Sequence, residues 1–293
     1  MHLSNLIPFG LHVISNRLVD ITEVERGVAC GCICPSCKQR LVARFCRDKS
    51  DHFAHDKNAS EQGINTKECS YSFFVAMRLM IKQCISDVDD LADFVIPPLE
   101  FVLARQDCSG KKHEQTFTVT EPKAVDIRDV KVETILNSSE IDIKGQVGEY
   151  TVALHFYYPG RSRFVGELNN DVCLIEIDLT FLKDMYINLD IAENNSFKNK
   201  VMEFVLNSIS SKSWYSHPLM KSALQDASSS MTSRIEAKNK EIQASRTSRL
   251  ERYSKYEGLG DYHCPRCEVG WFKEHKGLSC SQCYLPGYPI PRQ

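Results

Sequence analysis

"CICPSCKQRLVARFCRDKSDHFAHDKNASEQGINTKEC" (Cys32–Cys69) holds five cysteines and two histidines in 38 residues. Within this stretch, Cys34 and Cys37 form a Cys-x-x-Cys knuckle, and Cys69 adds a third thiol. Zinc prefers four sulfur or nitrogen ligands in a tetrahedron, so the three cysteines with His55 predict a structural Cys₃His site. A redox pair is the alternative for the knuckle, but it does not follow a strand and open a helix as thioredoxin-like pairs do.

The fourth ligand of this site is open to several neighbours. His52 offers the same donor chemistry as His55, from which two residues separate it. The other thiols of the region can also replace one ligand: Cys30, Cys32 and Cys46. We predict one zinc ion here, with His55 as the preferred histidine.

A second cysteine cluster lies near the end of the sequence. Cys264 and Cys267 form one knuckle, Cys280 and Cys283 form another, and 12 residues separate the two. Two such knuckles bring four thiolates together, which is typical of a zinc ribbon. The module over 258–293 is too short to fold on a hydrophobic core alone, so the metal is expected to supply folding energy. A closed four-cysteine site leaves no position for catalysis.

The composition is that of an ordinary globular protein. The chain has 293 residues, 42% of them hydrophobic and 25% charged, with a net charge of −2 and 13 cysteines. We find no long apolar run and no signal peptide, so we expect a cytoplasmic protein that does not enter a membrane. Thiols stay reduced in the cytoplasm, which favours metal binding over disulfides. The global charge gives no support for nucleic-acid binding.

The pattern of apolar residues predicts a mixture of strands and helices. We expect a hairpin within 11–28, strands at 40–45, 94–104, 115–120, 131–137, 139–145, 149–158 and 172–182, and helices at 71–86 and 199–209. Residues 221–256 lack glycine and proline and carry a sparse apolar stripe, which predicts a single solvated helix. Four domains follow: 1–70 with the first zinc site, a core over 71–220, a connecting helix over 221–257, and the ribbon over 258–293.

The order of these pieces resembles the competence protein CoiA-like family. The resemblance rests on "CPSC…HFAH…C" first, then on "LIEIDL" (174–179) and "WYSHP" (214–218), and it covers roughly residues 11–218. It implies an α/β (α+β) fold, with a restriction-endonuclease-like mixed sheet flanked by helices and small zinc-binding modules at both ends. It also implies DNA as the partner, in DNA uptake or antiphage defence, and Mg²⁺ or Mn²⁺ where the nuclease site is active.

The family's nuclease motif matches this sequence in part. Asp142 stands at the position of the motif's aspartate. His155 stands where the motif has glutamate, and Tyr157 where it has glutamine or lysine. Histidine is a poor Mg²⁺ ligand, so the motif is degenerate and favours Mn²⁺.

The strand around Asp142 offers a rebuilt site as an alternative. Asp142 and Lys144 form an Asp-x-Lys pair on one face, shared with Glu140 because strand side chains alternate. Glu133 from one strand earlier, and Glu176 with Asp178 from a later strand, can rebuild an acid cluster with them. The ordinary interpretation is a half-buried strand with its charges outward. The sequence thus leaves open a metal-dependent nuclease, an inactive nuclease fold that binds nucleic acid, and an adaptor that binds a protein partner through the long helix or the ribbon.

Overall fold

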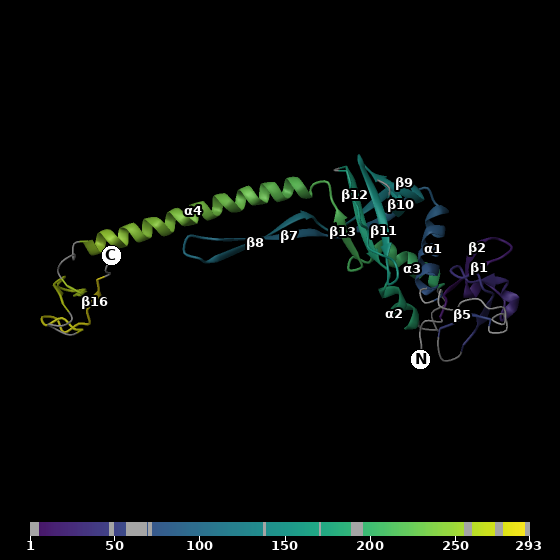
Figure 1. The fold of residues 1–293 in the computed structure, drawn as a ribbon, viewed down its shortest axis with the longest axis horizontal. Coiled ribbons are helices and arrows are strands. Elements are labelled where there is room, and N and C mark those ends of the chain that lie inside the picture. The colour runs from purple at the N-terminus through teal and green to yellow at the C-terminus, as the bar shows by residue number, and fades with distance from the viewer. Residues whose placement is uncertain are drawn as a thin grey trace. The chain divides into compact units, whose positions relative to one another are not determined.

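Figure 1 shows the computed structural model of the chain, which divides into two compact units. The first unit comprises Met1–Glu100 with Thr118–Ala223, and the second comprises Phe101–Phe117 with Leu224–Gln293. The structure describes the following residues, with the backbone alone for 249–254: 6–46, 50–56, 69, 72–136, 139–169, 171–188, 196–254, 260–272 and 278–290.

The N-terminal region is built from short antiparallel strands. The hairpin predicted within 11–28 is present as β1 (Phe9–His12) and β2 (Arg17–Asp20), and Asn16 takes the positive φ of 52° that its turn needs. The strand β3 (Cys32–Ile33) pairs with the other edge of β1. A separate pair consists of β4 (Leu41–Arg44) and β5 (His52–His55), and two short 3₁₀ turns lie at Ile21–Glu23 and Val28–Cys30.

A six-stranded mixed sheet forms the centre of the first unit, in the order β13-β12-β11-β10-β9-β6. Its strands are β6 (Leu91–Ile96), β9 (Lys123–Leu136), β10 (Ser139–Val147), β11 (Tyr150–Tyr157), β12 (Val172–Asp178) and β13 (Lys212–Ser216). The pair β11 and β12 is parallel, and every other neighbouring pair is antiparallel. The mixed α+β architecture predicted from the sequence is therefore confirmed.

Helices cover one face of this sheet, and an irregular loop covers part of the other. The helices α1 (Ser72–Ser86), α2 (Phe181–Ile187) and α3 (Phe197–Asn207) lie beside the sheet in Figure 1. Side chains of all three helices share one core with sheet residues such as Leu154 and with Phe9 of β1. This shared core explains why the N-terminal region and the central sheet form one unit rather than the two domains expected over 1–70 and 71–220.

The second unit contains a hairpin and a long helix. The hairpin consists of β7 (Leu99–Gln106) and β8 (Lys112–Thr120), and the helix is α4 (Met220–Ser254). The continuous helix predicted over 221–256 is present, but its apolar stripe is not fully solvated. The stripe residues Ala227, Met231 and Ile235 are buried, because four-residue spacing lines them up on one face beside the hairpin (Figure 1).

The C-terminal module is a small three-stranded sheet in the order β15-β14-β16. Its strands are β14 (Tyr262–His263), β15 (Gly270–Trp271) and β16 (Tyr288–Pro289). Its core cluster consists of the buried Cys264, Trp271 and Cys280. So small a core fits the expectation that a metal contributes to folding.

Candidate functional site

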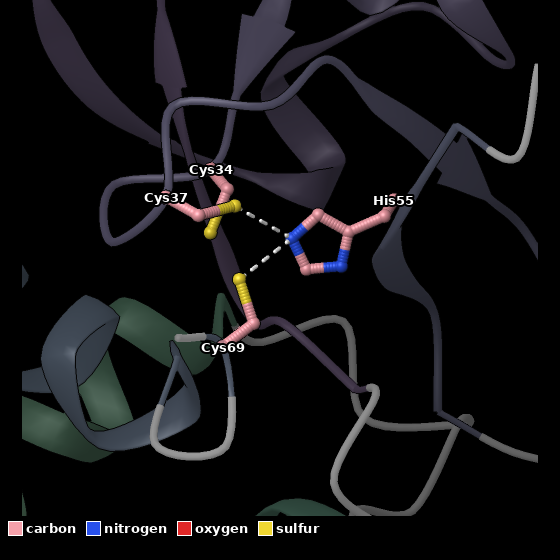
Figure 2. Close-up of side chains that lie close together, drawn as sticks. All are labelled: Cys34, Cys37, His55 and Cys69. Atoms are coloured by element: carbon pink, nitrogen blue, oxygen red, sulfur yellow. Dashed lines mark hydrogen bonds between the residues drawn. The ribbon is translucent and has the colours of Figure 1, made fainter. Parts of the chain in front are cut away.

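The N-terminal cluster brings together the four ligands preferred in the sequence. Cys34 and Cys37 lie on the turn after β3, His55 ends β5, and Cys69 lies shortly before α1 (Figure 2). The Nε2 atom of His55 lies 3.3 Å from the sulfur of Cys37 and 3.3 Å from the sulfur of Cys69. The four ligand atoms all lie within 4.8 Å of one another, so this group is able to hold a metal ion.

The C-terminal cluster has the same closed form. The sulfur atoms of Cys264, Cys267, Cys280 and Cys283 lie within 4.8 Å of one another, and Cys267 and Cys280 are separated by 3.6 Å. Ligands about 2.3 Å from a tetrahedral zinc ion would be separated by roughly 3.8 Å. Both clusters therefore fit an ion of this size, and their sulfur and imidazole donors are compatible with zinc.

All three Cys-x-x-Cys turns share one backbone geometry. In each turn the first cysteine donates its N–H to the carbonyl five residues later, over 2.7 Å for Cys34, 2.9 Å for Cys264 and 2.9 Å for Cys280. The residue four positions after that cysteine has a positive φ: Lys38, Glu268 and Tyr284. A lysine, a glutamate and a tyrosine do not favour this conformation by themselves, so the repeated geometry indicates that the turns are shaped to present two sulfur atoms.

Backbone donors and burial set the protonation of the ligands. The N–H of Cys267 is the main cause that lowers the pKa of Cys264, to about 7. Burial raises the pKa of Cys34, although the N–H groups of Cys37 and Ser36 act in the opposite direction. Burial lowers the pKa of His55, which favours the neutral imidazole that metals bind. A metal binding to the protonated thiols would release protons.

The other candidate ligands of the N-terminal region lie outside this cluster. The thiol of Cys30 donates to the carbonyl of Leu41, and that of Cys32 to the carbonyl of Cys30. Cys46 lies 3.9 Å from the Nδ1 atom of His52. The alternatives left open for the fourth ligand are thus resolved in favour of His55.

Three predicted site residues lie side by side on neighbouring strands, and we call Asp142, His155 and Glu176 the carboxylate row. Glu176 of β12 is paired with His155 of β11 in the sheet register. Asp142 precedes Ile143, which is paired with Leu154 at the end of the ladder between β10 and β11. All three are buried, so the expectation that Asp142 points outward from an ordinary strand is wrong.

Arginines on two sides bind the carboxylate of Asp142. Its Oδ1 accepts a hydrogen bond from Nε of Arg78 on α1 at 2.5 Å. Its Oδ2 accepts from Arg161 at 2.6 Å and from the N–H of Phe156 at 2.7 Å. Burial alone would raise the pKa of this carboxyl, but the charges of Arg78 and Arg161 outweigh burial and lower that pKa. Asp142 is therefore a carboxylate already neutralised by the protein.

Glu176 is held in the same way by the loop after β11. Its Oε2 accepts from Arg163 at 2.8 Å, and its Oε1 accepts from the N–H of Phe164 at 2.9 Å. The guanidinium of Arg163 also lies over the ring of Tyr157, 4.3 Å from its centre. Both carboxylates of the row are thus bound by protein cations.

His155 completes the row as a neutral side chain. Its Nε2 lies 3.2 Å from the carbonyl of Ser162, and its Nδ1 lies 3.9 Å from Oδ2 of Asp142. That Nδ1 has no hydrogen-bond partner among the described residues. Burial, assisted by the charge of Arg161, lowers the pKa of His155. The imidazole is therefore uncharged at neutral pH.

The other residues expected at the nuclease site are less closely placed. Lys144 forms no ion pair or side-chain hydrogen bond with Asp142 or Glu176 in the described part of the chain. Tyr157 lines a pocket of about 200 Å³ with Arg163, Glu176, Asp178 and Ser210–Ser213. Among the described residues, arginines form the ion pairs of the two carboxylates, although Lys212 also lines this pocket.

Of the additional acids of the rebuilt site, Asp178 lies beside the row, because it lines the same pocket as Glu176. Glu140 is exposed, and Glu133 forms an ion pair with Lys82. Asp178 accepts a hydrogen bond from the N–H of Thr180 at 2.9 Å.

Sequence reasoning missed the three arginines that bind the row: Arg78, Arg161 and Arg163. One signal was available, because Arg78 is the first charged residue in the otherwise apolar run that begins at Tyr71. In the structure this arginine of α1 donates to the carboxylate of Asp142. The loop that carries Arg161 and Arg163 has no periodic pattern of apolar residues. Its sequence therefore did not predict that these arginines bind the row.

No protein-family model, curated protein or solved structure matches the chain. Among the described helices, none has the length and apolar character required to cross a bilayer.

Proposed function

We propose that this chain is a DNA-binding protein of nuclease-like fold that does not hydrolyse DNA. Zinc ions held by the two cysteine clusters stabilise its small modules. Each cluster is closed, because its four ligands use every tetrahedral position, so we assign the metals a structural role. The resemblance of the zinc-knuckle region and the "LIEIDL" strand to CoiA-like proteins supports DNA as the partner, in DNA uptake or in defence against foreign DNA.

The observation that carries the proposal is the pair of guanidinium groups on Asp142. Arg78 approaches one carboxylate oxygen at 2.5 Å and Arg161 approaches the other at 2.6 Å. A nuclease of this kind needs those oxygens to bind Mg²⁺, and the arginines leave neither oxygen available. Their positive charge also repels a divalent cation.

The same residues favour phosphate over metal at this end of the sheet. Arg78, Arg161 and Arg163 carry three positive charges beside the carboxylates of Asp142, Glu176 and the nearby Asp178. Arginine binds phosphate with paired N–H donors, and the side chain of Arg163 is 57% exposed and able to reach a ligand. Binding without hydrolysis is the activity that this balance supports.

Slow hydrolysis is the second candidate, and the Nδ1 atom of His155 favours it. This buried nitrogen faces Asp142 without a hydrogen bond among the described residues. If Arg161 moved away, Asp142, His155 and Glu176 would offer mixed oxygen and nitrogen donors, which suit Mn²⁺ better than Mg²⁺.

One assay separates these candidates. Purified protein is incubated with labelled single- and double-stranded DNA in Mg²⁺ or Mn²⁺, with Asp142→Ala and His155→Glu alongside, and binding is measured by fluorescence anisotropy. The proposal predicts salt-sensitive binding and no cleavage by any of the three proteins. Cleavage that is lost in Asp142→Ala establishes hydrolysis instead. Failure to bind either form of DNA rejects the proposal.

A further inference from the structure

Hydrogen bonds hold the β7–β8 hairpin along the first half of α4. Arg105 donates to Ser228 at 2.8 Å, and Arg234 donates to Gln115 at 2.9 Å. The N–H of Cys108, at the tip of the hairpin, donates to Oδ1 of Asn239 at 2.7 Å. These contacts bring the hairpin tip, far away in the sequence, to the middle of the helix.

This arrangement gathers basic side chains at one place. Lys111 and Lys112 are exposed at the hairpin tip, and Lys238 and Lys240 flank the pinned Asn239 on α4. Exposed Arg246 follows two turns later along the helix. We call Lys111, Lys112, Lys238, Lys240 and Arg246 the basic junction.

Nearby acids neutralise only part of the basic junction. Asp107 accepts hydrogen bonds within the hairpin turn, from Ser109 and from the backbone of Lys111, and a further one from His113. Glu114 pairs with Lys112 at 2.5 Å, and Glu241 pairs with Lys238 at 2.8 Å. Lys111, Lys240 and Arg246 form no ion pair with any described residue.

The sequence extends this charge along the helix. Residues 238–255 contain six basic and two acidic side chains, although the whole chain has a net charge of −2. Beyond Arg246, basic residues recur every third position at Arg249, Arg252 and Lys255.

We infer that the basic junction forms the main contact with the phosphate backbone of the DNA. The inference rests on the proposed function and adds where the DNA binds. The expected occupant is an extended polyanion, because Lys111 and Lys112 lie at the hairpin tip while Lys238, Lys240 and Arg246 are exposed at successive positions along α4. Contact with phosphates by lysine and arginine carries no base preference, so the affinity is expected to depend on salt and not on sequence.

The test uses the full zinc-loaded chain and a 30-nucleotide DNA of mixed sequence, single- or double-stranded. The variant Lys111→Gln/Lys240→Gln/Arg246→Gln removes three exposed charges. The matched control, Lys123→Gln/Arg128→Gln/Lys131→Gln, removes three exposed charges from β9 in the other unit. Anisotropy titrations between 50 and 300 mM salt give the affinity and its salt dependence for each protein, and thermal melts confirm that each is folded.

The junction variant should bind at least tenfold more weakly at low salt, and its slope of log K against log salt should fall by about 2 to 3 units, near 0.9 per lost phosphate contact. The β9 control should bind as the wild type does. Equal slopes for wild type and the junction variant, with binding retained, overturn this inference and leave the proposed function standing. A wild type that binds no DNA at 50 mM salt rejects the proposed function itself.

Discussion

The cysteine clusters and the carboxylate row both gather polar side chains from separate segments, but they differ in how their charge is neutralised. In the clusters, no arginine or lysine among the described residues forms a hydrogen bond with a ligand sulfur. In the row, Asp142 and Glu176 each accept hydrogen bonds from arginine. A buried charge needs a partner. The clusters are able to hold a metal ion as that partner, whereas the row already has its partners in the arginines.

Metal removal is expected to have the largest effect and to affect the clusters alone. Chelation should unfold the C-terminal module, because Trp271 packs against the ligands Cys264 and Cys280 and a structural zinc contributes roughly 10 kcal/mol or more to such a fold. Cys264→Ser should expose Trp271 in the same way, seen as a red shift of its fluorescence. Cys173→Ser, which alters a buried thiol outside both clusters, is the control. Unchanged Trp271 emission after complete metal removal would show that the cluster is not structural.

Removing the Asp142 carboxylate should lower the free energy of unfolding by about 3 kcal/mol, which is less than the effect of metal removal. Asp142→Ala leaves Arg78 and Arg161 facing each other without their carboxylate, and losing one partner of a buried ion pair is strongly destabilising. Urea denaturation, followed by far-UV circular dichroism, measures the loss. Glu140→Ala, on the same strand but exposed, should change stability by about 0.5 kcal/mol or less. Equal effects of the two substitutions would contradict the internal neutralisation of the row.

Acid should weaken the row in a defined pH range. The pKa of Asp142 is lowered in the folded protein, so its ion pairs add their full stability above the unfolded pKa of about 3.9. That contribution is lost as the pH falls through the lower, folded pKa. Stability measured from pH 6 down to pH 2 should therefore fall less steeply in Asp142→Asn than in the wild type. Parallel curves of stability against pH for the two proteins would mean that the arginines do not lower the pKa of Asp142.

The smallest expected effect distinguishes the two arginines of the loop. Arg163 is 57% exposed, and its bond to Glu176 should contribute less than about 1 kcal/mol, because solvent screens it. Arg161 is 16% exposed and binds both Asp142 and the carbonyl of Phe156. Arg161→Ala should lower the urea midpoint more than Arg163→Ala does. The reverse order would mean that the ion pair between Arg163 and Glu176 stabilises the protein more than the ion pair between Arg161 and Asp142.

The parts that the sequence predicted correctly are those with local spacing rules. Cys34 and Cys37 lie three residues apart on one turn, so their shared role follows from the sequence without knowledge of the fold. The apolar patterns of 139–145 and 172–182 likewise predicted strands, which are present as β10 and β12. The preference for His55 over His52 was a choice that only the structure resolved, since both residues lie on β5.

The parts that the sequence did not predict depend on contacts between distant segments. Arg78 reaches Asp142 from α1, 64 residues away, and no periodicity links them. The pairing of the 101–117 hairpin with α4 joins residues more than 100 positions apart, as in the bond between Cys108 and Asn239. For this reason the apolar stripe of α4 was expected to be solvated, although the hairpin that covers it was itself predicted as strands.

The metal content of the protein tests the contrast between the clusters and the row most directly. The zinc-loaded chain is incubated with excess Mn²⁺, passed through a desalting column, and analysed by mass spectrometry of its elements, beside Asp142→Ala treated identically. We predict about two equivalents of zinc and no retained manganese in both proteins, because four-ligand clusters bind tightly and the arginines exclude a cation from Asp142. A third metal ion, retained by the wild type and lost in Asp142→Ala, would contradict this account and show that the row is a metal site.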